Sequence, residues 1–385
     1  MNYSFSSMQH LYVHWPFCPY KCHFCDFVAM ASHEQFMQDY HKALIKEIEL
    51  FIPFAPLNRR LQTIYLGGGT PSTYPAPLLL DTFVILKKHF EFDQTTEVTI
   101  EVNPGTVTLE LLLTWQQAGI NRLSIGVQSL KDVVLKSLNR HQTKQDVENV
   151  LKEASVYFQN LSVDFILGLP GVSDDEWKLM IQEAMGWPIK HISVYFLTVH
   201  EDTPLYFKVK TNRMTLPPDD GTVDLYDWTV ETLAKHGFDR YELSNFAKLG
   251  FQSRHNSAYW DRKNYKGFGL GACSFNGTMR FQNVKNLGKY LELLGQKETV
   301  IEVSEQLTSH QIALEKIMLG LRQSKGLVVA DYMKEATPSQ QLHFFQGAEK
   351  LKITGLIEYA NGIICLTPKG YALENEVALH LFSDY

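Results

Sequence analysis

Cysteine is scarce in this chain, which has five among 385 residues. Three of them, Cys18, Cys22 and Cys25, fall within eight residues, while Cys273 and Cys365 stand alone. Such few and unevenly placed cysteines exclude a disulfide framework. We expect the two single cysteines to be small, buried apolar residues. The crowding of the other three needs a chemical reason.

The sequence also has no long apolar run and no large excess of charge. No run reaches the roughly 18 residues that a membrane helix needs. Its 36 Lys and Arg against 42 Asp and Glu give a formal net charge of −6, so overall charge does not attract nucleic acid or anionic lipid. The first basic residue is Lys21, which is unlike a secretory or transit leader. We therefore expect a cytoplasmic protein.

Hydrophobic periodicity predicts short strands that alternate with helices. The strands are expected at Leu11–Trp15, Thr63–Gly69, Glu97–Val102, Arg122–Gln128, Ser162–Leu167 and His191–Leu197. The helices are expected at His33–Phe51, Pro77–Phe90, Leu109–Ala118, Lys144–Phe158 and Asp174–Met185. This alternation predicts an α/β fold with a parallel sheet that closes into a partial (β/α)6 barrel. In such barrels the chemistry lies at the carboxyl ends of the strands.

The rest of the chain predicts a different organisation. We expect a core at residues 1–240, a connecting segment at 241–300 and a smaller carboxyl-terminal α+β domain at 301–385. In the last part, helices at Ser309–Arg322 and Ser339–Lys352 precede a hairpin with the turn Ala360-Asn361-Gly362, a winged-helix-like order. Residues 301–385 hold 7 Lys and Arg against 10 Asp and Glu, so no nucleic-acid partner is expected.

The segment Cys18-Pro-Tyr-Lys-Cys22-His-Phe-Cys25 presents three thiols directly after a predicted strand. Thiolates are the ligands of iron–sulfur clusters. Three of them would leave the fourth iron of a four-iron cluster open to a substrate or cofactor. Two other interpretations stay open: a zinc site with His23 as the fourth ligand, and a redox dithiol made of Cys22 and Cys25.

This three-cysteine spacing resembles the signature of the radical S-adenosylmethionine (SAM) superfamily. Further blocks resemble the oxygen-independent coproporphyrinogen oxidase family, in order along the chain: Tyr12–Cys18, Gly67–Pro71, Glu101–Pro104, Arg122–Ser129, Arg140-His141 and Asp164–Gly171. The resemblance implies a radical SAM barrel and a [4Fe-4S] cluster held by Cys18, Cys22 and Cys25. It also implies that the open iron binds SAM, which the reduced cluster would cleave.

The resemblance implies a set of residues around SAM. Arg140 would neutralise the methionine carboxylate, and glycines would let the backbone approach the ligand. Acidic and amide side chains would pair with the ribose hydroxyls and the ammonium group. The expected SAM-binding residues are Tyr12, Gly68, Gly69, Thr70, Glu101, Gln128, Arg140 and Asp164.

Two branches of this family differ near the cluster cysteines and further along the chain. True oxidases resemble one another in a fourth cysteine at the place of Phe27 and in an amino-terminal extension, and we expect neither here. The segment from Arg254 to Trp260 resembles the His-Asn-x-x-Tyr-Trp motif of the HemW-type heme chaperones. His255 would then ligate heme iron while aromatic rings cover the macrocycle. A buried, hydrogen-bonded core histidine fits the same pattern, and Cys273 stands where the family often has histidine.

The resemblance therefore implies a heme chaperone that carries a SAM-bound cluster. Its partners would be heme and heme-accepting proteins, membrane respiratory proteins among them, which would bring the chain to the membrane surface. The alternative is an oxygen-independent coproporphyrinogen III oxidase, and a third is a radical modifier of nucleic acid. Whether the protein is an enzyme stays open, and the sequence is compatible with a homodimer.

Overall fold

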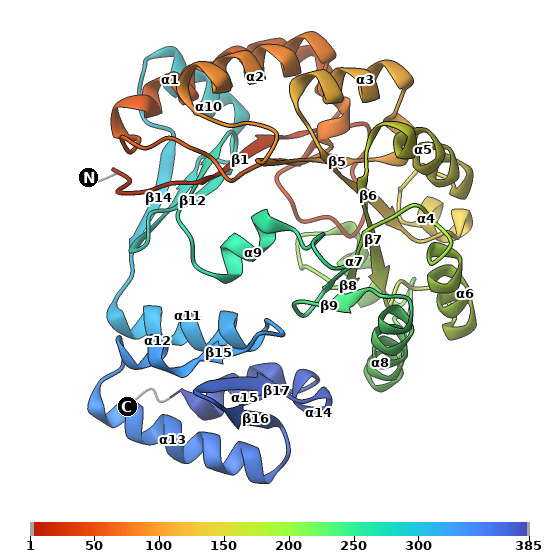
Figure 1. Cartoon of the computed structure of the whole chain (residues 1–385). Helices are drawn as coiled ribbons and strands as arrows, with labels where there is room; N and C mark the ends of the chain where they lie inside the picture. The colour runs from red at the N-terminus through yellow and green to blue at the C-terminus, as the bar shows by residue number, and fades with distance from the viewer. Residues whose placement is uncertain (1–3, 383–385) are drawn as a thin grey trace.

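The computed structural model describes residues 4–382, and its central feature is a twelve-stranded sheet in the order β14-β13-β12-β11-β1-β4-β5-β6-β7-β8-β10-β9 (Figure 1). Six consecutive members of this order are parallel to one another. They are β1 (His10–Trp15), β4 (Thr63–Gly68), β5 (Glu97–Val102), β6 (Arg122–Gln128), β7 (Asn160–Leu167) and β8 (His191–Phe196). These are the strands that the periodicity predicts.

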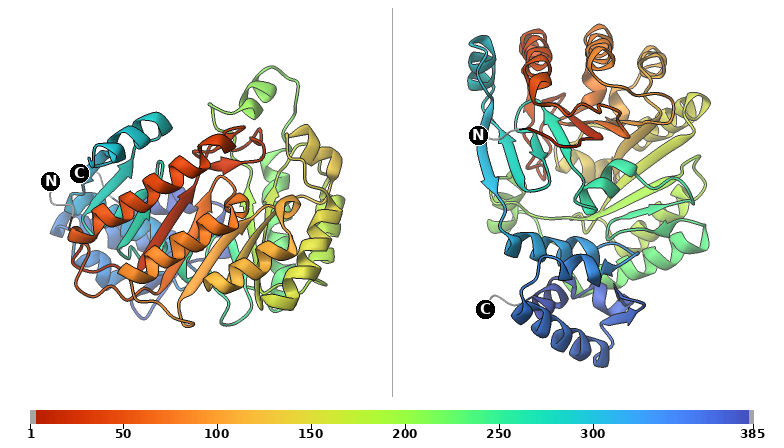
Figure 2. Two further views of the ribbon diagram at one scale, coloured as in Figure 1. Left: turned by 90° about the horizontal axis from the view of Figure 1, so that it is seen from above. Right: turned by 60° about the vertical axis from the view of Figure 1, so that its left-hand side comes forward.

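Helices connect the parallel strands and cover the outer face of the sheet, as Figure 2 shows. They are α1 (Met37–Phe51), α2 (Ala76–His89), α3 (Leu109–Ala118), α4 (Asp132–Ser137), α5 (Lys144–Tyr157) and α6 (Asp174–Ala184). Trp115 of α3 and Trp177 of α6 are fully buried, because the apolar side of each helix packs on the sheet. The α/β fold with six βα units is therefore confirmed. The short α4 was not predicted.

Residues beyond β8 extend the sheet at both edges. The helices α7 (Pro204–Lys210) and α8 (Asp219–Lys235) precede β9 (Asp239–Arg240) and β10 (Asn245–Ala247), which lie beyond β8. After α9 (Arg254–Trp260), β11 (Tyr265–Phe268) joins β1, and β12 (Cys273–Phe275), β13 (Met279–Asn283) and β14 (Ile301–Gln306) follow, with α10 (Leu287–Gly295) between the last two. Much of the predicted connecting segment thus belongs to the sheet itself. The predicted domain boundaries stay predictions.

The end of the chain forms a unit with its own core below the sheet (Figure 1). Its elements are α11 (Ser309–Leu321), β15 (Leu327–Val328), α12 (Val329–Met333), α13 (Pro338–Ile353), β16 (Ile357–Ala360), β17 (Ile363–Leu366), α14 (Pro368–Tyr371) and α15 (Glu374–Leu381). Asn361 and Gly362 both adopt positive φ, at 52° and 77°, as a tight two-residue hairpin turn requires. The predicted helix pair and hairpin are present.

Among residues 4–382, no helix combines the length and apolar character needed to span a bilayer.

Candidate functional site

A cavity of about 380 Å³ lies at the carboxyl ends of the parallel strands. Cys18, Cys22 and Cys25 line one side of it, and all three thiols are free. The other expected residues that line it are Gly68, Gly69, Thr70, Glu101, Gln128, Arg140 and Asp164. The strand ends therefore bring together residues that lie as far apart in the sequence as Cys18 and Asp164. We call this space the cluster cavity.

The cysteine loop is held in place by backbone pairing on both sides. The two short strands β2 (Phe17–Cys18) and β3 (Met30–Ala31) pair in parallel and enclose the loop. Within it, the His23 amide donates to the Leu138 carbonyl at 2.9 Å. Hydrogen bonds thus join the two ends of the loop to each other and join the loop to the segment that follows α4.

Polar side chains lie next to two of the cysteine sulfurs. Burial raises the pKa of the Cys18 thiol to about 11, so a metal that binds this sulfur must displace its proton. Thr70 Oγ1 lies 3.3 Å from Cys18 Sγ, and Arg140 Nη1 lies 3.7 Å from Cys22 Sγ. Both groups donate toward sulfur, which stabilises thiolate over thiol.

Gly69 leaves space that a larger residue would fill. A Cβ at this position would lie 2.5 Å from the Pro16 carbonyl oxygen and 3.0 Å from Cys18 Sγ. The Gly69 amide donates to the Trp15 carbonyl at 2.8 Å, which holds the two backbones close together. The glycine is therefore required by the close approach of the β4 end to the cysteine loop.

Glu101 is a buried acid at the centre of the cavity wall. The Tyr65 hydroxyl donates to its Oε1 at 2.9 Å, and the Gly68 amide donates to its Oε2 at 3.1 Å. Burial nevertheless raises the pKa of Glu101 to about 7, against the opposing effect of these hydrogen bonds. The carboxyl group can therefore lose or gain a proton near neutral pH when a ligand arrives.

Asp164 provides a buried carboxyl group at the cavity wall. Its Oδ2 accepts a hydrogen bond from Ser124 Oγ at 3.0 Å, whereas its Oδ1 is buried and has no hydrogen-bond partner among the described residues. Burial also raises the pKa of this carboxyl group. A buried acceptor without a partner is costly, so a ligand hydroxyl or ammonium group would satisfy it. This observation fits the expected contact with SAM.

Arg140 and Gln128 are placed by an irregularity at the end of β6. The pairing with β7 shifts between Gly126 and Gln128, and Gln128 adopts a positive φ of 65°. Arg140 Nη2 donates to the Gly126 carbonyl at 2.6 Å, and a Cβ on Gly126 would lie 2.9 Å from that same nitrogen. Such bulges turn side chains toward a site.

Sequence reasoning missed part of this cavity. Tyr20, Phe24, Tyr195, Phe196 and His200 also line it. Tyr20 fixes the wall by accepting a hydrogen bond from Asn103 Nδ2 at 2.7 Å. Tyr195 and Phe196 could have been identified from the sequence. They are aromatic residues at the carboxyl end of a predicted strand, and the other predicted strands carry site residues at that end.

The structure places two expected residues outside the cluster cavity. Tyr12 of β1 lines a neighbouring cavity instead, and its ring stacks on the ring of Tyr65 with 6.2 Å between the centroids. His255 is only 1% exposed, and its Nδ1 lies 2.6 Å from the Oγ1 of Thr63, the residue that begins β4. It therefore lies at the amino ends of the strands, opposite the cysteine loop.

Both ring nitrogens of His255 are engaged. In addition to the Thr63 contact, Nε2 lies 2.8 Å from the Tyr259 hydroxyl. Burial lowers the pKa of His255 well below its usual value, so the ring is neutral. Heme ligation by this residue would require the ring to break one of these hydrogen bonds and to become accessible.

The donor set is compatible with an iron–sulfur cluster. In residues 4–382, no group of three or more His, Cys, Asp or Glu side chains is arranged to hold one metal ion. A four-iron cluster binds each thiolate to a different iron, so its ligands line a cavity instead of converging on a point. Cys18, Cys22 and Cys25 have such an arrangement.

Known proteins have the same fold, and two family models match separate parts of the chain. Residues 12–184 match the Radical SAM superfamily, and residues 307–373 match the HemN C-terminal domain. The structure of coproporphyrinogen III oxidase (HemN) from Escherichia coli, a radical SAM enzyme, matches with a TM-score of 0.85 at 21% identity. The match covers 99% of this chain and 92% of that one, and it establishes the fold. Fold and site together define a radical SAM protein.

Named relatives show which family of radical SAM proteins the chain belongs to. A protein of Bacillus subtilis, "Heme chaperone HemW", is 32% identical over 96% of this chain and 98% of its own length. A Lactococcus lactis protein of the same name is 30% identical over 95% of both chains. The chain belongs to the HemW heme chaperone family.

Proposed function

We propose that the protein is a heme chaperone that binds heme, transfers it to acceptor proteins and carries a [4Fe-4S] cluster with bound SAM. The observation that carries this proposal is the similarity, over nearly the full length of both chains, to proteins named heme chaperone HemW. The acceptors would include respiratory proteins of the membrane. A cytoplasmic location with contact at the membrane surface belongs to the same proposal.

The cluster cavity supports the cofactor part of this proposal. Cys18, Cys22 and Cys25 would hold the cluster, and a reduced cluster supplies the electron that cleaves SAM. Arg140 would neutralise the SAM carboxylate next to Cys22. The free Oδ1 of Asp164 would accept a hydrogen bond from a ligand donor, and Gly68 and Gly69 would let the ligand approach the backbone.

The protein's own groups would also limit access to this cavity. Phe24 and Phe196 line its walls and present apolar surface. Asp26 and His200 also line the cavity, with 3.5 Å between His200 Nε2 and Asp26 Oδ2. Such walls would shield a reactive centre from water and oxygen.

The alternative function is that of a coproporphyrinogen III oxidase. The structural likeness to HemN favours it, but the place of the oxidases' fourth cysteine is taken by Phe27, a side chain that is 65% exposed. A phenyl ring cannot ligate a metal. We therefore propose heme transfer first.

Two assays on one anaerobically reconstituted preparation test the proposal. Hemin titration should shift the Soret band to saturation, and the bound heme should pass to an apo heme protein. Incubation with coproporphyrinogen III, SAM and a reductant should release no carbon dioxide. Carbon dioxide release with no heme binding would instead establish the oxidase.

The sequence also predicts His255 as a heme ligand, and this prediction has its own test. If His255 ligates the iron, His255→Ala should weaken hemin binding and alter the spectrum of the complex. Tyr259→Phe is the matched control, because it removes the hydroxyl that meets His255 Nε2 and leaves the imidazole in place. An equal loss in both variants would mean that His255 acts by positioning α9.

A further inference from the structure

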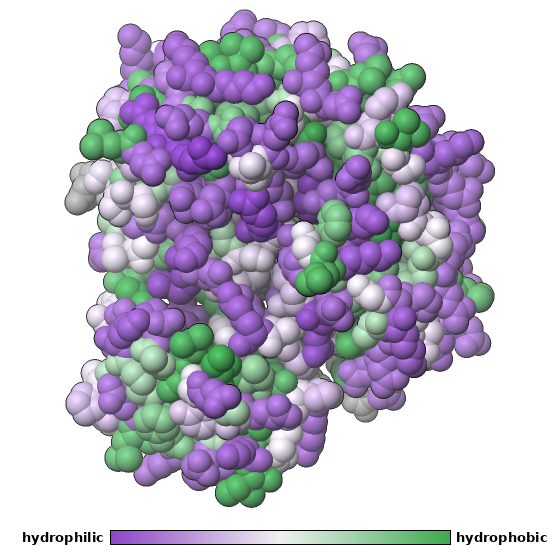
Figure 3. All heavy atoms as spheres, viewed as in Figure 1, coloured by the Kyte–Doolittle hydropathy of each residue, from purple (hydrophilic) through white to green (hydrophobic). Residues whose placement is uncertain are grey.

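A second cavity, of about 500 Å³, lies between the edge of the sheet and the carboxyl-terminal unit. Its lining comes from β1, from the loop after the cluster cysteines, from residues 259–285 and from α11. Figure 3 shows the surface hollowed between these two parts of the molecule. The volume is in the range of cofactor sites. We call it the edge cavity.

Aromatic rings form a wall of this cavity. The rings of Tyr259 and Tyr265 meet edge to face at 4.6 Å between centroids, and Phe275 follows at 6.3 Å from Tyr265. Burial raises the pKa of Tyr265 to about 12, so its phenol stays neutral. Phe27 and Val28 add apolar surface from the cysteine loop. Such a wall suits a large, flat, apolar ligand.

A thiol also faces this cavity. Cys273, which we expected to be buried, is exposed and lines the edge cavity at the start of β12. The expectation was wrong because the Cys273 side chain of β12, a strand paired with both β11 and β13, faces the edge cavity, and this long-range arrangement is not revealed by the local sequence. Its Sγ lies 3.6 Å from Gln282 Nε2. Thiolate sulfur is one of the groups that hold heme iron in proteins.

His14 also lines the edge cavity, but its ring nitrogens are less available for binding a metal than the Cys273 sulfur. The Nε2 of His14 lies 2.8 Å from the Val28 carbonyl and its Nδ1 lies 3.0 Å from the Tyr12 hydroxyl. With both ring nitrogens engaged, the imidazole has no free lone pair to offer without rearrangement. Cys273 therefore remains the accessible soft donor.

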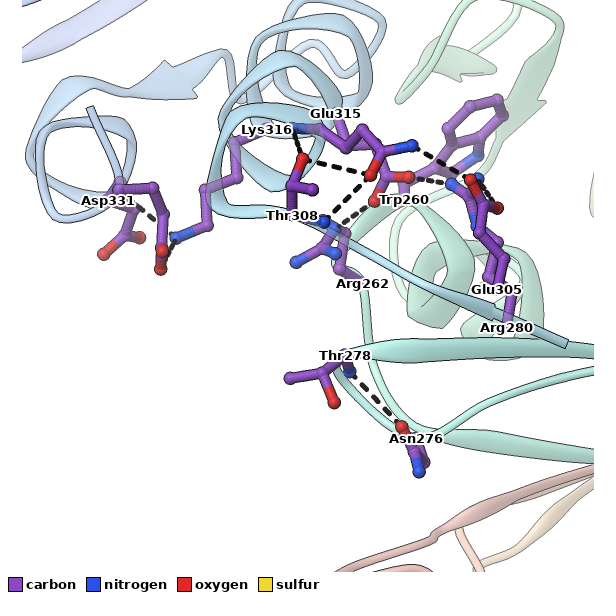
Figure 4. Close-up of polar contacts among 12 residues, drawn as sticks. Trp260, Arg262, Asn276, Thr278, Arg280, Glu305, Thr308, Glu315, Lys316 and Asp331 are labelled. Atoms are coloured by element: carbon purple, nitrogen blue, oxygen red, sulfur yellow. Dashed lines mark hydrogen bonds and ion pairs between the residues drawn. The ribbon is translucent and has the colours of Figure 1, made fainter. Parts of the chain in front are cut away.

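Cationic groups lie around the same cavity. Arg262, Arg280 and Lys285 line it together with the carboxylates of Asp26 and Glu315. Glu315 of α11 pairs with both arginines, at 2.7 Å to Arg262 Nε, as Figure 4 shows. Arg280 is still 49% exposed in this arrangement, and Lys285 is exposed. Arg280 Nη1 also lies 3.7 Å from Glu305 Oε2. Where they face solvent, Arg280 and Lys285 can meet the carboxylates of an anionic ligand.

We propose that the edge cavity is the heme site, with the Cys273 thiolate as an axial ligand of the iron. The macrocycle would lie against Tyr259, Tyr265 and Phe275, and its propionates would face Arg280 and Lys285. On ligation the thiol proton passes to solvent, and no electron is transferred. This inference rests on the proposed heme function, locates it in the molecule and assigns the ligand role to Cys273 in place of His255, which does not line the edge cavity.

Heme bound in the edge cavity would lie next to the cluster, because the two cavities share part of their lining. Asp26 and Phe27 line both the edge cavity and the cluster cavity. They directly follow Cys25, so a cluster that orders this loop would also order one wall of the heme site. Phe27 stands at the sequence position where the resemblance places the fourth cysteine of the oxidases.

Hemin titration of full-length, anaerobically reconstituted variants tests the proposal. Cys273→Ser should raise the dissociation constant about tenfold or more, as loss of a metal-site partner does, and should remove the thiolate character of the spectrum. Cys273→His should restore binding with an imidazole-type spectrum. Cys365→Ser, which changes a cysteine outside the cavity, should bind like the parent protein.

A charge variant tests the propionate contact separately. Lys285→Glu should weaken hemin binding, and the effect should shrink as salt screens the interaction. Lys297→Glu is the matched control, since this exposed lysine does not line the edge cavity.

The outcomes separate this inference from the proposed function. If the parent protein binds hemin and both Cys273→Ser and Lys285→Glu bind it equally well, the edge cavity is not the site, although heme binding stands. A thiolate spectrum that only His255→Ala disturbs would overturn the assignment as well. If the parent protein fails to bind hemin at all, the proposed function itself fails.

Discussion

Two buried carboxyl groups give the cluster cavity its chemical character at the scale of single residues. Glu101 is held by Tyr65 and Gly68, and Asp164 keeps one oxygen without a partner among the described residues. Neither feature is visible in the sequence, where a strand-end acid is most simply a helix cap. The motif resemblance identified both residues, and their burial explains why acids stand there.

The raised pKa of Glu101 leads to a pH dependence of SAM binding. Its pKa is about 7 with the cavity free of ligand, and SAM hydroxyl or ammonium donors favour the charged form. Binding must therefore release a proton below that pKa, so affinity should rise with pH up to about 7 and level off above it. Calorimetric titration of the cluster-loaded protein measures this slope. Glu101→Gln should flatten it, and an unchanged slope in that variant would assign the proton to another group.

Gly69 leads to a prediction about cluster loading. Gly69→Ala should lower the iron content per chain and the free energy of unfolding, the latter by about 1–3 kcal/mol, because the new methyl group overlaps the Pro16 carbonyl and presses on Cys18 Sγ. Gly295→Ala is the control, since nothing lies within 4 Å of its Cβ position. Iron analysis and denaturant unfolding check both values. Equal iron content in the two variants would refute this reading.

At the scale of elements, α11 fastens the carboxyl-terminal unit to the sheet. Glu315 meets Arg262, which follows α9, and Arg280 of β13 (Figure 4). The Arg262 and Glu315 side chains are 13% and 15% exposed, so this pair is largely removed from solvent. Losing one partner would leave a buried charge uncompensated.

Glu315→Ala should therefore destabilise the protein by about 1–3 kcal/mol, less than the loss of a fully buried pair costs because Arg280 keeps contact with water. Glu302→Ala is the control, since its pair with Lys289 is exposed and should contribute about 0–1 kcal/mol. Urea unfolding of both variants gives the comparison. A Glu315→Ala variant as stable as the control would show that the bridge does not hold α11.

Element length explains which parts of the fold could be predicted. The six parallel strands are apolar runs buried between the helices and the barrel interior, so their sequence has a clear signal. Strands β9, β12 and β15 have two or three residues each, too few to show a period of two. The strand β11 pairs with β1, which lies near the start of the chain, and a contact between such distant segments cannot be predicted from local sequence.

At the scale of the whole molecule, two cavities lie on either side of the same loop. The cluster cavity could be predicted because strand ends collect at one rim in a parallel barrel. The edge cavity could not, because its walls join residues as distant as Tyr12, Cys273 and Glu315. The exposure of Cys273 and the burial of His255 follow from this long-range packing, and both changed what the sequence alone suggested about heme.

The central claim is that three cysteines hold a four-iron cluster whose open iron binds SAM. Electron paramagnetic resonance of the anaerobically reconstituted, reduced protein tests it most directly. We predict a four-iron cluster signal whose shape changes when SAM is added and which is lost when Cys18, Cys22 and Cys25 are replaced by alanine. A protein that takes up no iron and sulfide, or whose signal ignores SAM, would contradict the account.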